Sequence, residues 1–294
     1  MKIGVAGLGR MGAAIAARLL EVGREVVVWN RSAARMKPLV EGGAATAASP
    51  AGLAAGVDVV ITILTDAPAI DAVYRGPQGL LSGDVAGKLF IEMSTVRPAT
   101  EIALAQEVRA KAAEFVECPV GGTVGPARTG KLLGLAGGET EGFTRARPIL
   151  DQVCRRVEHV GGVGAGSSMK LAINLPLAVF WQAFGEAYAL CRHLGADPAW
   201  LTELFADTSG GPNVLKARGA VVAEVLRTGK PATPSFDCDN IRKDLRTMVA
   251  EGKARGYDLP LTERTLAVLD EASDRGWGGR DCCDLPAYWS SRAG

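Results

Sequence analysis

Histidine is scarce in this chain of 294 residues, which contains two, His159 and His193. Neither lies in a cluster of potential ligands, and this argues against a histidine as catalytic base or metal ligand. Long apolar runs are also missing, since no stretch of about 18 apolar residues is free of charged side chains. We therefore expect neither a metal site built on histidine nor a membrane span.

A charge of one sign is equally lacking. The chain has 33 lysine and arginine residues against 32 aspartate and glutamate residues, which leaves a formal net charge of +1. The basic residues form no run, so there is no electrostatic reason to expect nucleic acid or an anionic membrane as a partner. The six cysteines show neither a C-x-x-C pair nor a Cys/His metal spacing, which favours reduced thiols in a cytoplasmic protein without a metal. Such a composition is typical of an enzyme that acts on small molecules.

Short apolar segments alternate with helical segments in the first half of the chain. The segments 11–22 and 98–113 are rich in alanine, leucine and arginine, and Pro98 suits the first turn of its helix. This alternation predicts an α/β fold with a doubly wound, mostly parallel sheet of the Rossmann type. The predicted strands, each aliphatic or β-branched and bounded by Gly, Pro or polar residues, are 2–6, 25–29, 57–64, 89–93, 114–118 and 132–136.

The second half of the chain has a different pattern. Residues 161–166 are rich in glycine, and no convincing strand follows them. One long helical pattern covers 167–194, with Pro176 inside it and Gly195 placed to end it. We predict two domains, 1–162 with the sheet and 163–294 with helices alone, joined by the long helix. The further predicted helices are 198–207, 219–228, 239–255 and 261–275.

A glycine-rich turn links the first predicted strand to the first helix. It reads Gly7-Leu8-Gly9-Arg10-Met11-Gly12, and this spacing between a strand and a helix is typical of dinucleotide binding. Gly7 permits the tight turn, Gly9 lets the backbone approach the pyrophosphate, and Gly12 lets the helix pack closely on the strand. A turn of this kind also exists without a ligand, but the strand before it and the amphipathic helix after it favour a bound dinucleotide.

The end of the second predicted strand indicates which dinucleotide binds. NAD sites usually place Asp or Glu there to hold the ribose hydroxyls, whereas this chain has Asn30-Arg31-Ser32. Arg31 can pair with a 2′-phosphate, and Asn30 and Ser32 can donate hydrogen bonds to it. We therefore expect NADP, with NAD as the alternative if Arg31 is an ordinary solvated residue of the loop.

Two further strand ends are expected to approach the nicotinamide ribose. Leu64-Thr65 and Ser94-Thr95 each follow a predicted strand. Ligands of open parallel sheets lie at the carboxyl ends of the strands. Leu64, Thr65 and Thr95 are therefore predicted cofactor residues as well.

Four segments of the chain follow one another in a characteristic order. They are the glycine turn at 7–12, Cys118-Pro119-Val120-Gly121-Gly122-Thr123-Val124-Gly125-Pro126-Ala127 with Gly137-Gly138, Gly164-Ala165-Gly166-Ser167-Ser168-Met169-Lys170 with Asn174, and Lys243-Asp244-Leu245 after Phe236. These segments resemble the β-hydroxyacid dehydrogenase family, whose members include 3-hydroxyisobutyrate dehydrogenase, tartronate semialdehyde reductase and the glyoxylate/succinic semialdehyde reductases. The resemblance covers essentially the whole chain.

The resemblance implies an NAD(P)-dependent oxidoreductase that transfers hydride between the nicotinamide and a small β-hydroxy acid or semialdehyde. Its nucleotide-binding domain would be of the 6-phosphogluconate dehydrogenase type. Lys170 would act as general acid/base, since a lysine can donate a proton to a carbonyl oxygen and take it back from the hydroxyl. Asn174, one helical turn away on the same face, would hold the substrate or orient Lys170. Gly121, Gly122 and Thr123 would bind the substrate carboxylate through N–H groups.

The resemblance also gives Lys243 a role at the cofactor or the substrate, although a solvated helix charge beside Arg242 is the alternative. Two positions depart from the family pattern. Gly121 stands where serine is common, and Ile173 stands where an asparagine usually precedes Asn174. Each departure removes a polar group, so we expect a pocket that is shifted from the best-known substrates.

Two other functions share part of this pattern. Imine reductases have a similar two-domain plan and an Asn-Arg-Ser/Thr signature, but they usually carry Asp or Tyr at the position of Lys170. A non-catalytic dinucleotide-binding scaffold would be expected to have lost that lysine. Lys170 therefore favours the dehydrogenase over both alternatives.

The long helix after Lys170 is apolar all round and includes Phe180, Trp181 and Phe184. A helix of this kind has to be buried, either against its own chain or against a second copy. We expect a homodimer or homotetramer, with burial in the core of the same chain as the alternative or the complement.

Overall fold

The computed structural model describes residues 1–292. The chain divides into two compact units, Met1–Leu171 and Ala172–Gly294, and the helix α8 (Ala165–Cys191) runs across the division. The predicted domain boundary after residue 162 stays a prediction. Within residues 1–292, no helix combines the length and the hydrophobicity that crossing a bilayer requires.

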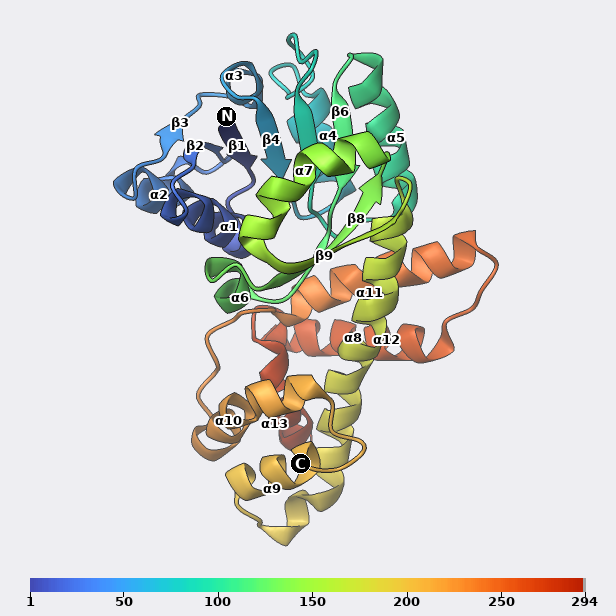
Figure 1. The fold of residues 1–294 in the computed structure, drawn as a ribbon. Coiled ribbons are helices and arrows are strands. Elements are labelled where there is room, and N and C mark those ends of the chain that lie inside the picture. The colour runs from blue at the N-terminus through green and yellow to red at the C-terminus, as the bar shows by residue number, and fades with distance from the viewer. Residues whose placement is uncertain (293–294) are drawn as a thin grey trace. The chain divides into compact units, whose positions relative to one another are not determined.

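The first unit contains a mostly parallel sheet with helices on both faces (Figure 1). The strand order is β3-β2-β1-β4-β5-β6-β8-β7, and β9 pairs with β8. Neighbours from β3 to β6 run parallel, as do β8 and β9, whereas β8 is antiparallel to β6 and to β7. The predicted doubly wound α/β fold is thereby confirmed. The strands are β1 (Lys2–Ala6), β2 (Glu25–Trp29), β3 (Ala45–Thr46), β4 (Val59–Thr62), β5 (Leu89–Glu92), β6 (Glu114–Glu117), β7 (Val120–Gly121), β8 (Leu132–Gly138) and β9 (Cys154–Gly161).

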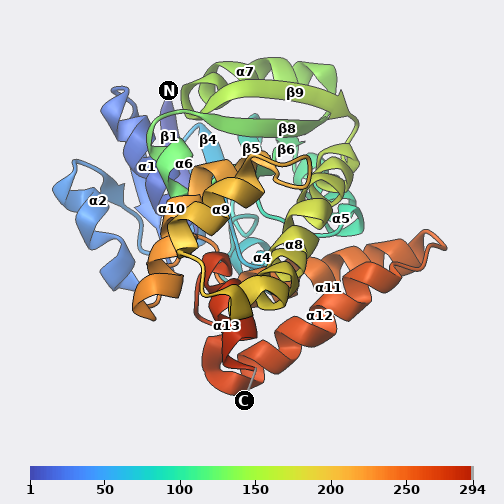
Figure 2. The same cartoon turned by 90° about the horizontal axis from the view of Figure 1, so that it is seen from below.

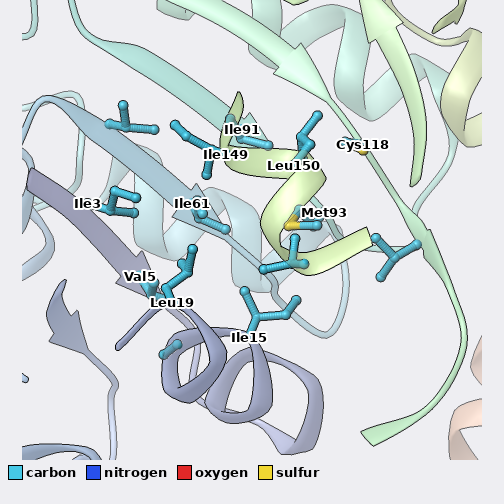
Figure 3. Packing of buried hydrophobic residues seen from close by; sticks show 14 of the residues in the cluster. Ile3, Val5, Ile15, Leu19, Ile61, Ile91, Met93, Cys118, Ile149 and Leu150 are labelled. Carbon is cyan, nitrogen blue, oxygen red and sulfur yellow. The ribbon is translucent and has the colours of Figure 1, made fainter. Parts of the chain in front are cut away.

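Two apolar clusters hold the layers of this unit together, one on each face of the sheet. On one face, Ile15 and Leu19 of α1 and Ile149 of α7 pack against Ile3 and Ile61 of the strands (Figure 3). On the other face, α3, α4 and α5 supply the second cluster. Successive residues of a strand pack into opposite clusters, because side chains alternate between the two faces of the sheet. The helices are α1 (Arg10–Glu21), η1 (Ala33–Arg35), α2 (Lys37–Glu41), α3 (Pro50–Ala55), α4 (Ala67–Arg75), α5 (Pro98–Ala110), α6 (Val124–Arg128) and α7 (Thr140–Val153).

All six predicted strands are present, and the sequence does not predict β3, β7 and β9. β3 and β7 are two residues long each, too short to give a hydrophobic pattern. β9 exposes Arg155 and Arg156 and buries Cys154 and Val157. Charged side chains are common on a strand that has one neighbour, and here they interrupt the alternation that identifies a strand.

In the described residues 172–292 the second unit contains helices and loops, with one isolated β-bridge between Asp237 and Asp281, which confirms the all-helical prediction for this half of the chain. α9 packs on α10, and α11 packs on α12, as both views of the fold show (Figures 1 and 2). The predicted long helix ends in a 3-10 turn, after which Gly195 adopts a left-handed φ of 60° and closes it. The elements after α8 are η2 (Arg192–Leu194), α9 (Pro198–Ala206), α10 (Asn213–Thr228), α11 (Cys238–Ala254), α12 (Pro260–Ala272), η3 (Ser273–Trp277), η4 (Cys282–Asp284) and α13 (Leu285–Ser291).

Aromatic side chains pack the interior of the second unit. The ring of Phe184 on α8 meets that of Phe205 edge-on, with 5.4 Å between their centroids. Gly185 on the next position of α8 faces the indole of Trp289, and a Cβ at this glycine would overlap the ring. Trp181 and Phe184 are both buried, so they contribute to the core of the chain itself.

Candidate active site

In the glycine turn between β1 and α1, the surrounding protein leaves no room for a side chain at two of the three glycines, Gly7 and Gly12. Gly7 has a left-handed φ of 96°, and a Cβ there would collide with the carbonyl oxygen of Ile63. A Cβ at Gly12 would collide with the carbonyl oxygen of Gly7. Gly7 therefore makes the turn and Gly12 lets α1 approach it, as the sequence predicts.

Gly9 is different, because the protein itself does not require a glycine there. Its φ of −66° and ψ of −173° suit any residue. A Cβ at Gly9 would meet one described atom within 4 Å, Nη1 of Arg35 at 3.9 Å. The space above Gly9 is thus available to a ligand, and the turn fits the pyrophosphate of a dinucleotide.

The start of α1 adds the charge that such a ligand needs. Within the described residues, no side chain caps this helix end and its first turn contains no acidic residue. The first residue of the helix is Arg10, although a positive charge is unfavourable at the positive end of a helix dipole. An anion bound at the helix N-terminus would offset this cost.

Two side chains after β2 contact the glycine turn. Asn30 Oδ1 accepts a hydrogen bond from the Leu8 N–H at 2.9 Å, and Asn30 Nδ2 donates to the Ser32 carbonyl at 3.0 Å. Arg35 Nη1 donates to the Leu8 carbonyl at 3.4 Å. Asn30 therefore orders the turn, while Arg31 and Ser32 are exposed beside it. Sequence reasoning missed Arg35, although its place one helical turn after Ser32 was a usable signal.

The carboxyl ends of β4 and β5 are joined by hydrogen bonds. The Leu64 N–H donates to Ser94 Oγ at 2.7 Å, and the Ser94 N–H donates to Glu92 Oε2 at 2.8 Å. Ser94 Oγ donates in turn to Glu92 Oε1, and Thr62 Oγ1 approaches the same oxygen at 3.4 Å. These bonds bring Leu64 and Ser94 together at the edge where the sequence predicts the nicotinamide ribose. Thr65 and Thr95 follow them directly in the chain.

A second buried carboxyl lies beside this network. Glu101 of α5 is fully buried close to Glu92. Among the described residues, no N–H or hydroxyl donates to either Glu101 oxygen, which favours the protonated form of this carboxyl over the ionised one. Burial and the charge of Glu92 raise the pKa of Glu101 well above its ordinary value, and burial also raises the pKa of Glu92. Sequence reasoning found neither glutamate.

The segment predicted to bind the substrate carboxylate forms β7 and the start of α6. Gly122 has a left-handed φ of 126°, and Thr123 is the residue that precedes α6. A Cβ at Gly121 would lie 3.6 Å from Leu133 Cβ, an ordinary contact. The backbone therefore does not require glycine at 121, and the missing serine hydroxyl is a difference in chemistry alone.

Lys170 and Asn174 lie one turn apart on α8, and both are nearly buried, with exposed fractions of 7% and 9%. Asn174 Nδ2 donates to Asp244 Oδ2 at 3.2 Å. Lys243 Nζ forms an ion pair with Asp244 Oδ1 at 2.6 Å. Asp244 therefore links two of the predicted site residues, Asn174 and Lys243, within the second unit, and the Lys243-Asp244 segment was its signal in the sequence.

The N-terminus of α8 is held by Glu117, the last residue of β6. Its buried carboxylate accepts hydrogen bonds from the N–H groups of Gly164, Gly166 and Ser167 and from the Ser167 hydroxyl. Sequence reasoning missed this residue too. The signal for it was a charged side chain in the apolar run Phe115-Val116-Glu117-Cys118, since a buried charge requires partners.

Comparison with known proteins places both halves of the chain in one family. Residues 2–161 match the model of the NAD binding domain of 6-phosphogluconate dehydrogenase. Residues 164–288 match the model described as the NAD-binding domain of NADP-dependent 3-hydroxyisobutyrate dehydrogenase. Together the two matches cover the segments on which the resemblance rests.

Individual relatives agree with these matches. The chain is 40% identical to 3-hydroxyisobutyrate dehydrogenase of Pseudomonas aeruginosa over 97% of both chains. It is 31% identical to glyoxylate/succinic semialdehyde reductase 1 of Arabidopsis thaliana over 96% of both. The crystal structure of 3-hydroxyisobutyrate dehydrogenase from Salmonella typhimurium superposes with a TM-score of 0.87 at 26% identity, covering 98% of this chain and 99% of that one.

A solved imine reductase is less similar to this chain than the 3-hydroxyisobutyrate dehydrogenase structure is. The enzyme from Myxococcus stipitatus, solved with NADP+, has a TM-score of 0.66 and 22% identity over 97% of this chain and 98% of its own, and it shares the fold alone. The family predicted from the sequence is thus confirmed, and the imine reductase alternative is the weaker one. The chain belongs to the β-hydroxyacid dehydrogenase family and is an NAD(P)-dependent oxidoreductase that acts on CH–OH groups.

Proposed function

We propose that the chain is an NADP-preferring enzyme that interconverts a small β-hydroxy acid and the corresponding semialdehyde, with Lys170 as general acid/base. The observation that carries the proposal is the pair on α8, where Lys170 and Asn174 are nearly buried one helical turn apart. Relatives named as 3-hydroxyisobutyrate dehydrogenase and as semialdehyde reductase support this substrate class.

The bound nicotinamide supplies hydride for reduction and accepts it in oxidation. During reduction, Lys170 Nζ donates a proton to the carbonyl oxygen, and during oxidation the same amine takes the proton of the hydroxyl. Asn174 is held through its Nδ2 by Asp244, and its amide group would orient the substrate or Lys170. The N–H groups of the segment 121–123 hold the substrate carboxylate.

A panel of short aldehyde acids, including glyoxylate and succinic semialdehyde, tests the activity with NADPH. Lys170→Ala is expected to lower kcat by about 10²- to 10⁴-fold, the usual contribution of a general acid or base. The exposed Lys111 provides the control, and Lys111→Ala should leave turnover unchanged. A Lys170→Ala enzyme with wild-type turnover would refute the assigned role. Reduction of cyclic imines but not of aldehyde acids would favour the imine reductase, and NADPH binding without any turnover would favour a scaffold.

The preference for NADP rests on two arginines and a missing acid. No Asp or Glu follows β2, where the sequence is Trp29-Asn30-Arg31-Ser32. Arg35, which reaches the Leu8 carbonyl, adds a second guanidinium to Arg31 for a 2′-phosphate. Loss of one charge-assisted contact corresponds to about a 10-fold rise in KM for NADPH. Arg35→Ala should show this rise with NADPH and none with NADH, and a wild-type enzyme that prefers NADH would refute the proposal.

Gly121 is proposed to set which acid the enzyme accepts. Because a side chain fits there without strain, Gly121→Ser should fold normally and restore a hydroxyl beside the carboxylate-binding N–H groups. We expect the ranking of kcat/KM across the aldehyde-acid panel to change, while KM for NADPH stays the same. An unchanged ranking would remove Gly121 from the substrate site.

We also propose that the chain forms a homodimer or homotetramer through its second unit. Leu190 and Leu194, at the end of the long helix, are 80% and 65% exposed. Trp200 and Leu204 are half exposed beside a groove of about 840 Å³ between α9 and α10. Large apolar side chains with this exposure are common at association surfaces. Trp200→Glu should lower the molar mass measured by light scattering, whereas an unchanged mass would place the interface elsewhere.

A cytoplasmic location stays a prediction. The six cysteines on which it depends are free thiols in the structure.

A further inference from the structure

Glu117 has an unusual set of partners for a buried carboxylate, because all of them belong to one segment. Its Oε1 accepts hydrogen bonds from the Gly164 N–H at 2.5 Å and the Gly166 N–H at 2.9 Å. Its Oε2 accepts from the Ser167 N–H at 3.2 Å and from the Ser167 hydroxyl at 2.5 Å. The side chain of one strand end is thus bound to the bend that starts α8 and to the first turn of that helix.

The surrounding backbone is adapted to this carboxylate. Gly137 of β8 lies directly against it, and a Cβ at this glycine would collide with Glu117 Oε1. A Cβ at Gly166 would come within 3.2 Å of the same oxygen. Gly164 has a left-handed φ of 97°, which turns its N–H toward the carboxylate. These glycines therefore form a socket around Glu117.

The ionised form of Glu117 is the one that fits the socket. Three of the four partners are backbone N–H groups, which can donate and cannot accept, so a carboxyl proton would find a single acceptor among them, the Ser167 hydroxyl. Burial raises the pKa of Glu117, and the four hydrogen bonds oppose that rise. A negative charge at this place also matches the positive end of the α8 dipole.

The anchored turn is followed directly by the proposed general acid. Lys170 comes one helical turn after Ser167, on the same face of α8. Whatever fixes the backbone and hydroxyl of Ser167 therefore also fixes the direction in which the Lys170 side chain leaves the helix. All of these residues lie within the first unit.

We propose that Glu117 is a positioning residue for the reaction, which holds the start of α8 so that Lys170 presents its amine to the carbonyl oxygen at a constant place. This role rests on the function proposed for Lys170. Proton transfer depends steeply on placement, and a displacement of about 1 Å can cost roughly 10²-fold in rate. Glu117 thereby acts on turnover without contacting substrate or cofactor itself.

Glu117→Gln tests the proposal with the smallest change in shape. The amide has to point its NH2 group either at the N–H groups of Gly164 and Gly166, which loses two hydrogen bonds, or at Ser167, which loses the N–H hydrogen bond and turns the hydroxyl into an acceptor. We expect kcat to fall by about 10- to 100-fold, while the Kd for NADPH, measured by nicotinamide fluorescence, changes less than 2-fold. Ser167→Ala, which removes the hydroxyl alone, should give a smaller loss and keeps the test valid if Glu117→Gln folds poorly. Glu114→Gln, at the other end of β6, is the matched control and should keep wild-type kcat.

A double-mutant cycle separates positioning from general destabilisation. If Glu117 acts through the lysine, Glu117→Gln lowers kcat in the wild-type background and has no further effect in Lys170→Ala. An equal loss in both backgrounds, or no loss in the wild-type background, would overturn the positioning role. A Lys170→Ala variant with wild-type turnover is a separate outcome, because it would refute the proposed function itself.

Discussion

The helices α1 and α8 both begin after a glycine-rich turn, but their N-termini have opposite surroundings. At α1, no described side chain caps the helix and Gly9 faces open space. At α8, the N–H groups of Gly164, Gly166 and Ser167 are all bound by the buried carboxylate of Glu117. The same positive helix end is thus left available for a phosphate in one case and filled by the protein in the other.

This difference explains two uses of one local structure. A helix N-terminus without a protein partner can bind an anionic ligand and release it. A helix N-terminus that already holds a carboxylate is fixed, and whatever follows on the helix is fixed with it. The first arrangement suits the cofactor, and the second suits a side chain such as Lys170 whose position must not vary.

The comparison predicts a large loss of stability when the socket at α8 is obstructed. Gly137→Ala would place a methyl group against Glu117 Oε1, 2.8 Å from the Gly162 carbonyl oxygen and 3.0 Å from the Gly166 N. Two of these atoms belong to the backbone and cannot move aside easily. We expect the free energy of unfolding to fall by roughly 3 kcal/mol, as overpacking in an interior commonly costs. Urea denaturation measures this, with Gly83→Ala, where a Cβ meets nothing within 4 Å, as the control.

A glycine-to-alanine substitution at the start of α1 should leave stability unchanged and weaken NADPH binding instead. Gly9→Ala introduces a methyl group into open space with acceptable backbone angles, so the unfolding midpoint should stay that of the wild type. The methyl group would instead block the approach of the pyrophosphate. We expect the Kd for NADPH to rise by about 30-fold, or about 2 kcal/mol. A destabilised protein with normal NADPH affinity would show that Gly9 serves the fold, and the contrast between the two helices would then be lost.

The sequence predicts the fold in detail, but it predicts only one of the two helix N-termini, that of α1. Six β-branched or aliphatic runs and a glycine turn were enough for the central sheet, because local pattern and burial agree there. β9 was missed since Arg155 and Arg156 are exposed on it. The open turn at α1 could be predicted because all its residues are neighbours in the chain.

The filled turn at α8 could not be predicted in the same way. Glu117 stands out in the sequence as a charge in an apolar run, but its partners at 164–167 are about fifty residues away along the chain. Which distant N–H groups a buried carboxylate meets is decided by the packing of β6, β8 and α8, and periodicity carries no information on it. Arg35 was missed for a related reason, since its contact with Leu8 depends on how η1 folds back.

Glu101 is another buried carboxyl, and it shows what happens when donors are missing. Glu101 lies in the same unit as Glu117, but no described N–H or hydroxyl donates to it. Burial and the nearby Glu92 raise the pKa of Glu101 well above its ordinary value. The folded state therefore keeps a proton that the unfolded chain loses above about pH 4.3. Because the folded state binds more protons, stability falls as the pH rises from that value toward the raised pKa.

Glu101→Gln removes this dependence, since an amide replaces the protonated carboxyl and cannot ionise. The free energy of unfolding should fall less between pH 5 and pH 8 than in the wild type, with a difference of about 1 kcal/mol in favour of the variant at pH 8. Glu107 on the same helix is the control, because its pair with Arg75 lowers its pKa. Glu107→Gln should change stability by less than about 0.5 kcal/mol, and in the opposite direction, since the pair is largely solvated. If Glu101→Gln followed the wild-type pH dependence, the Glu101 carboxyl would have to be ionised like that of Glu117, and the contrast between a carboxyl with donors and one without would fail.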